Sequence, residues 1–403
     1  MIKLSRRALI ASVPILAGSA MIPSAWAATS PESRLLVINL RGALDGLAAI
    51  VPVGDPALGS LRAALNTQKM PGLPLDSMFE LNGNLSSLYQ LYQAKEALFF
   101  HAVATPYRSR SHFDAQMVLE SGQPNVGGDG TGWLNRALAV TPMLNGQERL
   151  GKPALTVSPT VPLMLRGSAP VESWQPQVLQ QADLDLAARL LTVYEARDAE
   201  LAKALRQGVG IDTFLGEQAM SAPEGAMRVS AAGRFATTME AVGRLLAEKD
   251  GPRVAAMAID GWDTHASQGS EVGRLATQFR ALDAGIAALK LNMGALWKDT
   301  VVVIVTEFGR TARANGSAGT DHGTGGIAML VGGRVMGGRV LADWPGLDER
   351  NLFEGRDLMP TMDLRGVLKG VLSEGLGLDQ SALAQVVFPD SRLIKPVTGL
   401  LRL

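Results

Sequence analysis

The chain has 403 residues, 47% of them hydrophobic and 19% charged, and its formal net charge at pH 7 is zero. This length can bury a large core, and the balanced charge gives no reason to expect nucleic acid as a partner. The sequence contains no cysteine, which excludes disulfides, thiolate metal ligands and thiol catalysis.

The N-terminus has the pattern of a signal for export by the twin-arginine machinery. A twin-arginine start at Ser5–Arg7 precedes an apolar run over Ala8–Ala20, and Ala25–Ala27 offers a small-x-small cleavage pattern. A membrane anchor is the less favoured alternative, because Pro14 and Gly18 break a short apolar run. We therefore expect residues 1–27 to be removed. The mature chain should be periplasmic or secreted, with no transmembrane segment.

Short apolar, β-branched runs predict buried strands at Leu35–Leu40, Ala97–Val103, Val254–Ile259, Val301–Thr306 and Ile327–Val331. Strands that are apolar on both faces need helices on both sides of the sheet. Helical patterns fall between these runs, at Leu85–Lys95, Ser111–Glu120, Ala182–Gln207, Glu224–Glu248, Val272–Trp297 and Thr361–Leu372. The alternation predicts an α/β fold with three αβα layers and a mostly parallel sheet.

The mature chain, 28–403, is expected to form one such domain. Within it, the segment Gly122–Pro176 is rich in Gly, Pro and Ser, and two long helical patterns follow. We expect residues of about 122–250 to form a cap or an insertion on the sheet.

Acids, histidines and a serine follow the ends of four predicted strands. In open α/β sheets the carboxyl ends of the strands form the edge where ligands bind, so these side chains should converge there. Imidazole and carboxylate together are common ligands of zinc, manganese and iron. The candidate residues are Asp45, Ser111, His112, Asp260, Asp263, His265, Glu307, Arg310, Asp321 and His322.

Each of these residues also has an ordinary structural interpretation. Asp45 suits a turn or a helix N-cap, Asp321 with His322 suits a turn, and Glu307 suits a plain ion pair with a nearby arginine. The sequence does not decide between Asp260 and Asp263 as the ligand. The conjunction of all the pieces, more than any single one, favours a metal or catalytic site.

Ser111 has two interpretations that place it at the same point of the chain. It suits the N-cap of the helix that begins at His112, and it also suits a nucleophile activated by the helix N-terminus and a metal. Arg310, together with Arg108 and Arg110, suits the binding of a phosphate or sulfate group, with solvated surface arginines as the alternative.

The motifs RGALDGL, PYRSRSHFDAQ, DGWDTH, TEFGR and DHG occur in this order along the chain. In this respect the whole mature chain resembles the domain-of-unknown-function 1501 family, whose members are commonly exported by the twin-arginine route. That family in turn looks like a branch of the alkaline phosphatase and sulfatase superfamily, so the resemblance implies an αβα fold that usually holds two metals.

Position by position, the resemblance implies roles for several residues. Asp45 matches the first-strand metal ligand, Ser111 the nucleophile, and His322 the final metal histidine. Asp260 or Asp263 with His265 resembles a ligand pair, and Glu307 stands at the next carboxylate. The sequence departs from the superfamily at Phe308, where a histidine ligand is common. His112, His101 or Asp321 could compensate, or only one metal could bind.

The sequence therefore predicts an exported, metal-dependent hydrolase of small anionic esters of phosphate or sulfate. One or two divalent metals, with zinc, manganese, calcium and magnesium all open, would act with Ser111 as nucleophile. Arg310 would bind the non-bridging oxygens. The alternative is a non-catalytic binding or assembly protein of the cell envelope, with a structural ion on the same fold. An open cleft above the acids would favour the enzyme, and a closed site the alternative.

Overall fold

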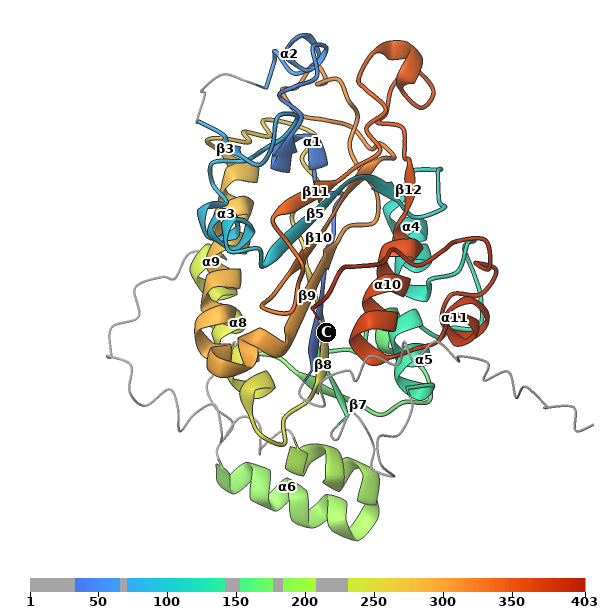
Figure 1. Ribbon diagram of the computed structural model, residues 1–403. Helices are drawn as coiled ribbons and strands as arrows, with labels where there is room; N and C mark the ends of the chain where they lie inside the picture. The colour runs from blue at the N-terminus through green and yellow to red at the C-terminus, as the bar shows by residue number, and fades with distance from the viewer. Residues whose placement is uncertain (1–32, 66–70, 142–152, 177–183, 208–230, 403) are drawn as a thin grey trace, which may run out of the picture.

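The computed structural model describes five stretches of the chain. They are residues 33–65, 71–141, 153–176, 184–207 and 231–402. The predicted export signal at residues 1–27 lies outside them. The described part is built as a central sheet between two layers of helices (Figure 1).

The central sheet has the strand order β11-β5-β10-β9-β1-β8-β6-β7, and β12 pairs with β5 beyond this path. A smaller sheet has the order β2-β4-β3. The strands of the central sheet are β1 (Arg34–Leu40), β5 (Ala97–Ala104), β6 (Ala154–Val157), β7 (Val171–Trp174), β8 (Val254–Ile259), β9 (Thr300–Val305), β10 (Gly326–Val331), β11 (Arg339–Leu341) and β12 (Met362–Asp363). Those of the smaller sheet are β2 (Ile50–Val51), β3 (Leu73–Pro74) and β4 (Glu80–Leu81).

Strand direction brings the ends of several strands to one edge. In the central sheet β1 runs parallel to both β8 and β9, whereas β10 runs antiparallel to both β9 and β5. The carboxyl ends of β1, β5, β8 and β9 therefore share an edge with the amino end of β10. The fold class, an α/β protein with a mostly parallel sheet, is confirmed, but the reversed direction of β10 was not predicted.

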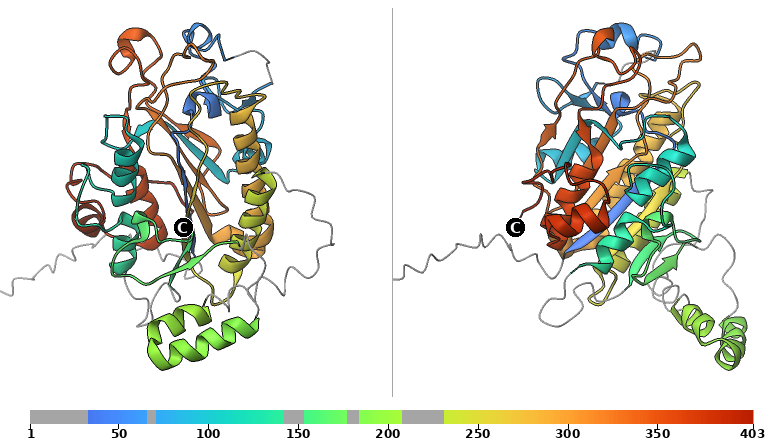
Figure 2. Two further views of the ribbon diagram at one scale, coloured as in Figure 1. Left: turned by 180° about the vertical axis from the view of Figure 1, so that it is seen from behind. Right: turned by 90° about the vertical axis from the view of Figure 1, so that its right-hand side faces the viewer.

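Alternate side chains along each strand point to opposite faces of the sheet and pack into two separate cores. In β1, Leu36, Ile38 and Leu40 belong to one core, and Leu35 and Val37 belong to the other. Figures 1 and 2 show a helical layer on each side. One layer contains α3 (Ser86–Gln93), α8 (Ala231–Ala247) and α9 (Arg274–Met293), and the other α4 (His112–Ser121), α5 (Trp133–Ala139), α10 (Leu364–Leu376) and α11 (Gln380–Ala382). Fully apolar strands are what two covered faces require.

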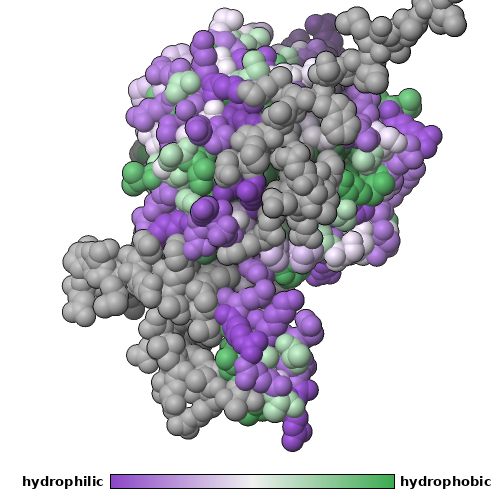
Figure 3. Space-filling model, turned by 60° about the horizontal axis from the view of Figure 1, so that its bottom comes forward, coloured by the Kyte–Doolittle hydropathy of each residue, from purple (hydrophilic) through white to green (hydrophobic). Residues whose placement is uncertain are grey.

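The range from 122 to 250, expected as a cap or insertion, contributes β6 and β7 to the central sheet itself. Helix α6 (Leu184–Arg197) lies at the end of the molecule opposite α1 (Gly46–Ala49) and α2 (Leu58–Leu61) (Figure 1). Seen from that end, the described surface is mostly hydrophilic with small hydrophobic patches (Figure 3).

The single helix expected at Ala182–Gln207 is interrupted at Asp198. The Asp198 carboxylate accepts the backbone N–H groups of Glu200 and Leu201, so it caps the helical turns that follow. Within the described ranges, every helix is either too short or too polar to cross a membrane.

Candidate metal centre

Helix α4 delivers the first histidine of the centre. Strand β5 ends at Ala104, and a loop with Arg110 in the left-handed region (φ 62°) leads to Ser111. Ser111 is the N-cap residue, and its Oγ accepts the backbone N–H of Asp114 at a long 3.5 Å. His112 is then the first residue of the helix, at the edge of the sheet. The N-cap interpretation of Ser111 is therefore present in the structure, although as a weak hydrogen bond.

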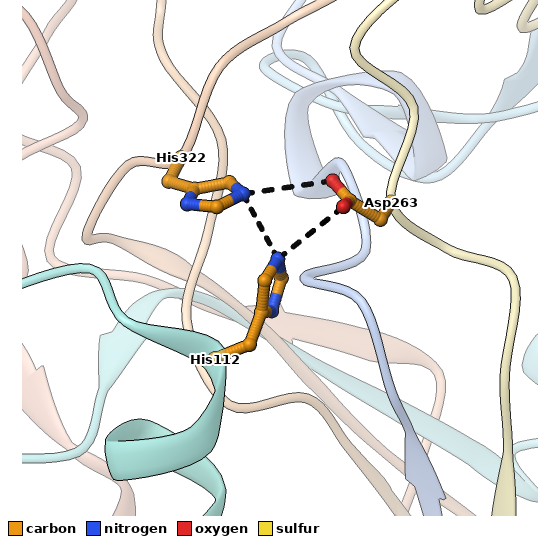
Figure 4. A group of neighbouring side chains, drawn as sticks. All are labelled: His112, Asp263 and His322. Atoms are coloured by element: carbon orange, nitrogen blue, oxygen red, sulfur yellow. Dashed lines mark hydrogen bonds and ion pairs between the residues drawn. The ribbon is translucent and has the colours of Figure 1, made fainter.

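Three histidines and one aspartate converge above this edge. His322 Nε2 lies 2.9 Å from the Nε2 atoms of both His112 and His265. Asp263 Oδ1 is 3.0 Å from His265 Nε2 and 3.6 Å from His322 Nε2, while Asp263 Oδ2 is 3.6 Å from His112 Nε2. Figure 4 shows His112, Asp263 and His322 pointing at a common centre. The ligand atoms of these three residues lie within 4.8 Å of one another and could hold a metal ion.

On its far side, each ring has Nδ1 next to an oxygen that can only accept a hydrogen bond. For His112 and His322 this places the hydrogen on Nδ1 and leaves a lone pair on Nε2. His265 has an accepting carboxylate oxygen at both ring nitrogens, Asp321 Oδ1 and Asp263 Oδ1. The Nε2 lone pairs of His112 and His322 face each other at 2.9 Å and repel, and a cation bound by both removes the repulsion. This is the usual arrangement behind metal-ligating histidines. The pairs are His112 with Glu307 Oε1 at 2.8 Å, His265 with Asp321 Oδ1 at 3.1 Å, and His322 with the Arg110 backbone oxygen at 3.0 Å.

Glu307 supports the centre from below. Its side chain is fully buried, and Oε1 accepts hydrogen bonds from the Gly42 backbone at 2.9 Å and from Gln116 Nε2 at 3.2 Å, in addition to His112. Burial opposes ionisation of Glu307, but these hydrogen bonds, from His112 first, outweigh it and keep its pKa below the ordinary value. Glu307 thus stays a carboxylate that orients His112, and in the structure it lies behind the ring.

Glycine is needed where the first motif passes beneath the centre. Gly42 has φ 115°, and a Cβ at this position would lie 2.5 Å from the backbone nitrogen of Asp263. The close approach lets the Gly42 N–H reach Glu307 while the loop after β8 carries Asp263 over it. The next residue, Ala43, also has positive φ (58°), a conformation that favours glycine.

Arg310 neutralises the acid of the centre. Its side chain is wholly buried, and Nη1 lies 2.8 Å from Asp263 Oδ1. Burial opposes the charge on Asp263, and the pairing with Arg310 more than compensates, so the pKa of Asp263 is lowered. Arg310 is therefore in contact with the aspartate of the centre and does not face open solvent.

Asp45 lies apart from the histidines. It is fully buried and paired with Arg62, and it also accepts a hydrogen bond from Gln268 Nε2 at 2.6 Å. Gln268 Oε1 in turn accepts a hydrogen bond from Thr320 Oγ1 at 2.8 Å. Thr320 Oγ1 itself accepts a hydrogen bond from Arg310 Nε at 3.2 Å. A buried chain of hydrogen bonds thus connects Asp45 to the centre, but the positive charge next to Asp45 is a guanidinium.

The remaining candidates take other positions. Asp260 is exposed, with its backbone oxygen accepting from Gln278, so Asp263 is the aspartate that the structure brings to the histidines. Asp321 lies behind His265 and is half exposed. His101 is fully buried, and its Nε2 is hydrogen-bonded to the Ile50 backbone oxygen instead of facing the other three histidines. Phe308 is buried against the rings of His112 and His322, with centroids 4.8 and 5.3 Å apart.

Sequence patterns did not identify the partners that complete this arrangement. Arg62 lies outside the five motifs. The contact of the Arg110 backbone oxygen does not depend on the residue type, so the sequence cannot indicate it. Gln116 had one available signal, because it lies four residues after His112 and so on the same face of α4.

The centre is open to solvent. The side chains of His265 and Asp263 are 45% and 42% exposed, and those of His322 and His112 are 27% and 21% exposed. Catalytic metal sites keep such an open position, whereas structural sites are enclosed. The fold and the site together define an α/β protein with an open histidine–carboxylate centre at the carboxyl edge of its sheet.

The chain belongs to the family described as "Protein of unknown function (DUF1501)", whose model matches residues 94–386. No curated protein matches the chain. Solved structures with a similar fold include a protein of the alkaline phosphatase superfamily from Vibrio parahaemolyticus, at 13% identity and a TM-score of 0.41, covering 91% of this chain and 70% of that one.

The PsFucS1 sulfatase from Pseudoalteromonas sp. is similar at 12% identity and a TM-score of 0.37, again covering 91% of this chain and 70% of that one. Ps i-CgsB in complex with k-i-k-neocarrahexaose is similar at 12% identity and a TM-score of 0.42, covering 90% of this chain and 77% of that one. Similarity at this distance carries no argument about chemistry, which depends on the side chains described above.

Proposed function

We propose that this protein is a metal-dependent hydrolase of phosphate or sulfate esters. The observation that carries the proposal is the convergence of three imidazole Nε2 atoms on the carboxylate of Asp263, with every Nδ1 committed to an acceptor. The partial exposure of the group supports an enzyme over a closed structural site.

In this proposal His112, His265, His322 and Asp263 hold one divalent ion. Three imidazole ligands favour zinc over calcium, magnesium and manganese, which prefer oxygen ligands. A bound ion would supply Lewis-acid stabilisation to the ester oxygens. Glu307, Asp321 and the Arg110 carbonyl keep the three rings in the ligating tautomer, and Arg310 holds Asp263 in place.

Ser111 is the proposed nucleophile. It immediately precedes a histidine of the centre, at a helix N-terminus that stabilises negative charge. Its Oγ would form a bond to phosphorus or sulfur as the bond to the ester oxygen breaks, with the serine proton leaving on the released alcohol. Water would then hydrolyse the enzyme ester and restore the serine hydroxyl.

We also propose export by the twin-arginine machinery to the periplasm or beyond, on the strength of the N-terminal pattern. That machinery moves folded proteins, so the ion would enter the centre before export.

Two observations favour a second candidate, a binding or assembly protein of the envelope with a structural ion. Arg62 pairs with Asp45, the position of a first-strand metal ligand, and Phe308 lies where a further histidine is common. Both features limit the centre to a single ion. The experiment below separates the two candidates.

Replacing Ser111 by alanine should lower the turnover of the ester that the wild type hydrolyses best by about a thousandfold. The metal content should stay unchanged. His265→Ala should lose both. The measurements are elemental analysis of the purified protein and a screen of aryl phosphates and sulfates. Ser381→Ala, an exposed serine of α11, is the matched control. Unchanged turnover in Ser111→Ala removes the nucleophile, and a metal-loaded wild type without turnover supports the second candidate.

A further inference from the structure

A pocket with a volume of about 560 Å³ opens beside α4. Small-molecule sites in proteins generally have volumes of about 300–1,000 Å³, so this pocket has room for one ligand. Helix α4 supplies one wall with four residues spaced by three or four positions, and the segment between β6 and the short helix η1 (Leu163–Leu165) supplies the opposite wall. The residues of the helical wall are Phe113, Gln116, Met117 and Glu120.

The pocket lies beside the candidate metal centre along α4, although none of the ligating side chains lines it. Phe113 directly follows His112, the first residue of α4. Gln116 lines the pocket and donates from Nε2 to Glu307 Oε1, the same oxygen that contacts His112 Nδ1. The helical wall of the pocket is therefore the part of α4 that directly follows the His112 position of the centre.

The walls nearest the solvent are apolar. The Phe113 side chain is 84% exposed, which is unusual for a phenyl ring, and Met117 is 36% exposed. Val161, Pro162 and Leu163 face them from the opposite wall. When a ligand covers an exposed aromatic ring, apolar surface is removed from water, and this favours binding.

The charged residues of the pocket are one ion pair and one arginine at the rim. Arg41 Nη2 pairs with Glu120 Oε1 at 2.8 Å, so these two charges cancel. Arg166 donates from Nε to the Val161 backbone oxygen at 3.1 Å, and no carboxylate in the described part of the chain forms an ion pair with it. The pocket thus has one uncompensated positive charge.

We infer that this pocket binds the alcohol part of the ester and selects esters whose alcohol is apolar and of ring size. The inference rests on the function proposed above, because it places the phosphate or sulfate group at the metal centre. Phe113 and Met117 would cover one face of the alcohol part, and the segment Val161–Leu163 the other. Phe113 is therefore a specificity residue, without a part in the chemical step.

Two phosphonates that cannot be hydrolysed test the selection. With the zinc-loaded protein, calorimetry should show 2-naphthylmethylphosphonate binding about tenfold more tightly than methylphosphonate. Phe113→Ala should reduce this preference to about twofold or less. Leu291→Ala, which removes a similarly exposed side chain (81%) from α9, should leave it unchanged. An equal affinity of the wild type for both phosphonates, or a preference that survives in Phe113→Ala, overturns the inference.

A neutral probe separates this inference from the proposed function. 2-Naphthylmethanol should bind the metal-free wild type, and its affinity should fall several-fold in Phe113→Ala but not in Leu291→Ala. If this result holds while neither phosphonate binds the zinc-loaded protein, the hydrolase proposal fails and the pocket for an apolar group stands. If 2-naphthylmethanol binds the wild type and Phe113→Ala equally, or binds neither, the pocket assignment is overturned.

Discussion

At the scale of single residues, His101 is the histidine of this chain that the candidate centre does not use. It lies in β5 with no exposed surface, its Nε2 hydrogen-bonded to the Ile50 backbone oxygen and its Nδ1 accepting from the Ala102 N–H. Because Nδ1 accepts, the ring is neutral. Burial lowers its pKa from the ordinary 6.5 to about 4.

The buried neutral His101 should make stability depend on pH. Between pH 6.5 and about 4, the unfolded chain binds a proton at this residue that the folded chain does not. Its contribution to stability is thus full above pH 6.5 and falls as the pH drops to about 4, by about 3 kcal/mol. Urea unfolding at pH 7.5, 5.5 and 4.5 should show a smaller loss in His101→Gln than in the wild type. Identical pH dependence in both proteins would contradict the assignment.

How far the sequence predicts the site is clearest for three residues. His112, Asp263 and His322 were recognised because motifs at strand ends must meet at one edge of a parallel sheet. The different position of Asp45 could not be predicted, because the choice between an ion and Arg62 depends on a loop whose path no local pattern specifies. The choice of Asp263 over Asp260 depends likewise on the backbone turn after β8, which leaves Asp260 in solvent.

At the scale of elements, Arg62 joins three parts of the molecule. It caps the end of α2, pairs with Asp45 after β1, and donates to the backbone oxygens of Thr311 and Ala312 in the loop between β9 and β10. A buried charge left alone by the loss of its partner is more costly than the removal of both charges.

Breaking this pair from one side should therefore destabilise the fold strongly. We expect Arg62→Met to lower the free energy of unfolding by about 3–5 kcal/mol, because Asp45 then remains buried as an unpaired charge. The double variant Asp45→Asn, Arg62→Met should recover part of that loss. Urea unfolding of the two single variants and the double variant measures the coupling. Strictly additive losses would show that the two charges do not depend on each other.

The five strands predicted from buried β-branched runs agree with β1, β5, β8, β9 and β10 to within a residue at each end, whereas the shorter strands β6, β7, β11 and β12 had no predicted bounds. The direction of β10 was not predicted. Its residues are buried on both faces like those of its neighbours, and burial pattern is insensitive to strand direction. The break at Asp198 was missed because the helical periodicity continues through it.

At the scale of the whole molecule, the centre depends on complete folding, because His112 and His322 are 210 positions apart in the chain. An ion bound only by the folded state stabilises it by mass action. With zinc at about a hundred times its dissociation constant, unfolding should cost about 2.7 kcal/mol more than in chelator. Thermal unfolding should show a higher Tm with zinc for the wild type and no change for His265→Ala. A shift of equal size in both would place the zinc elsewhere.

The reversed direction of β10 has one more consequence. Residues 306–325 leave the sheet at the end of β9 and return to the same edge at the start of β10, and they carry Glu307, Arg310, Asp321 and His322 between these two points. Both ends of this stretch are anchored side by side on neighbouring strands. Evolution or an engineer could therefore exchange it as a single segment and alter the side chains of the candidate centre while every strand kept its register.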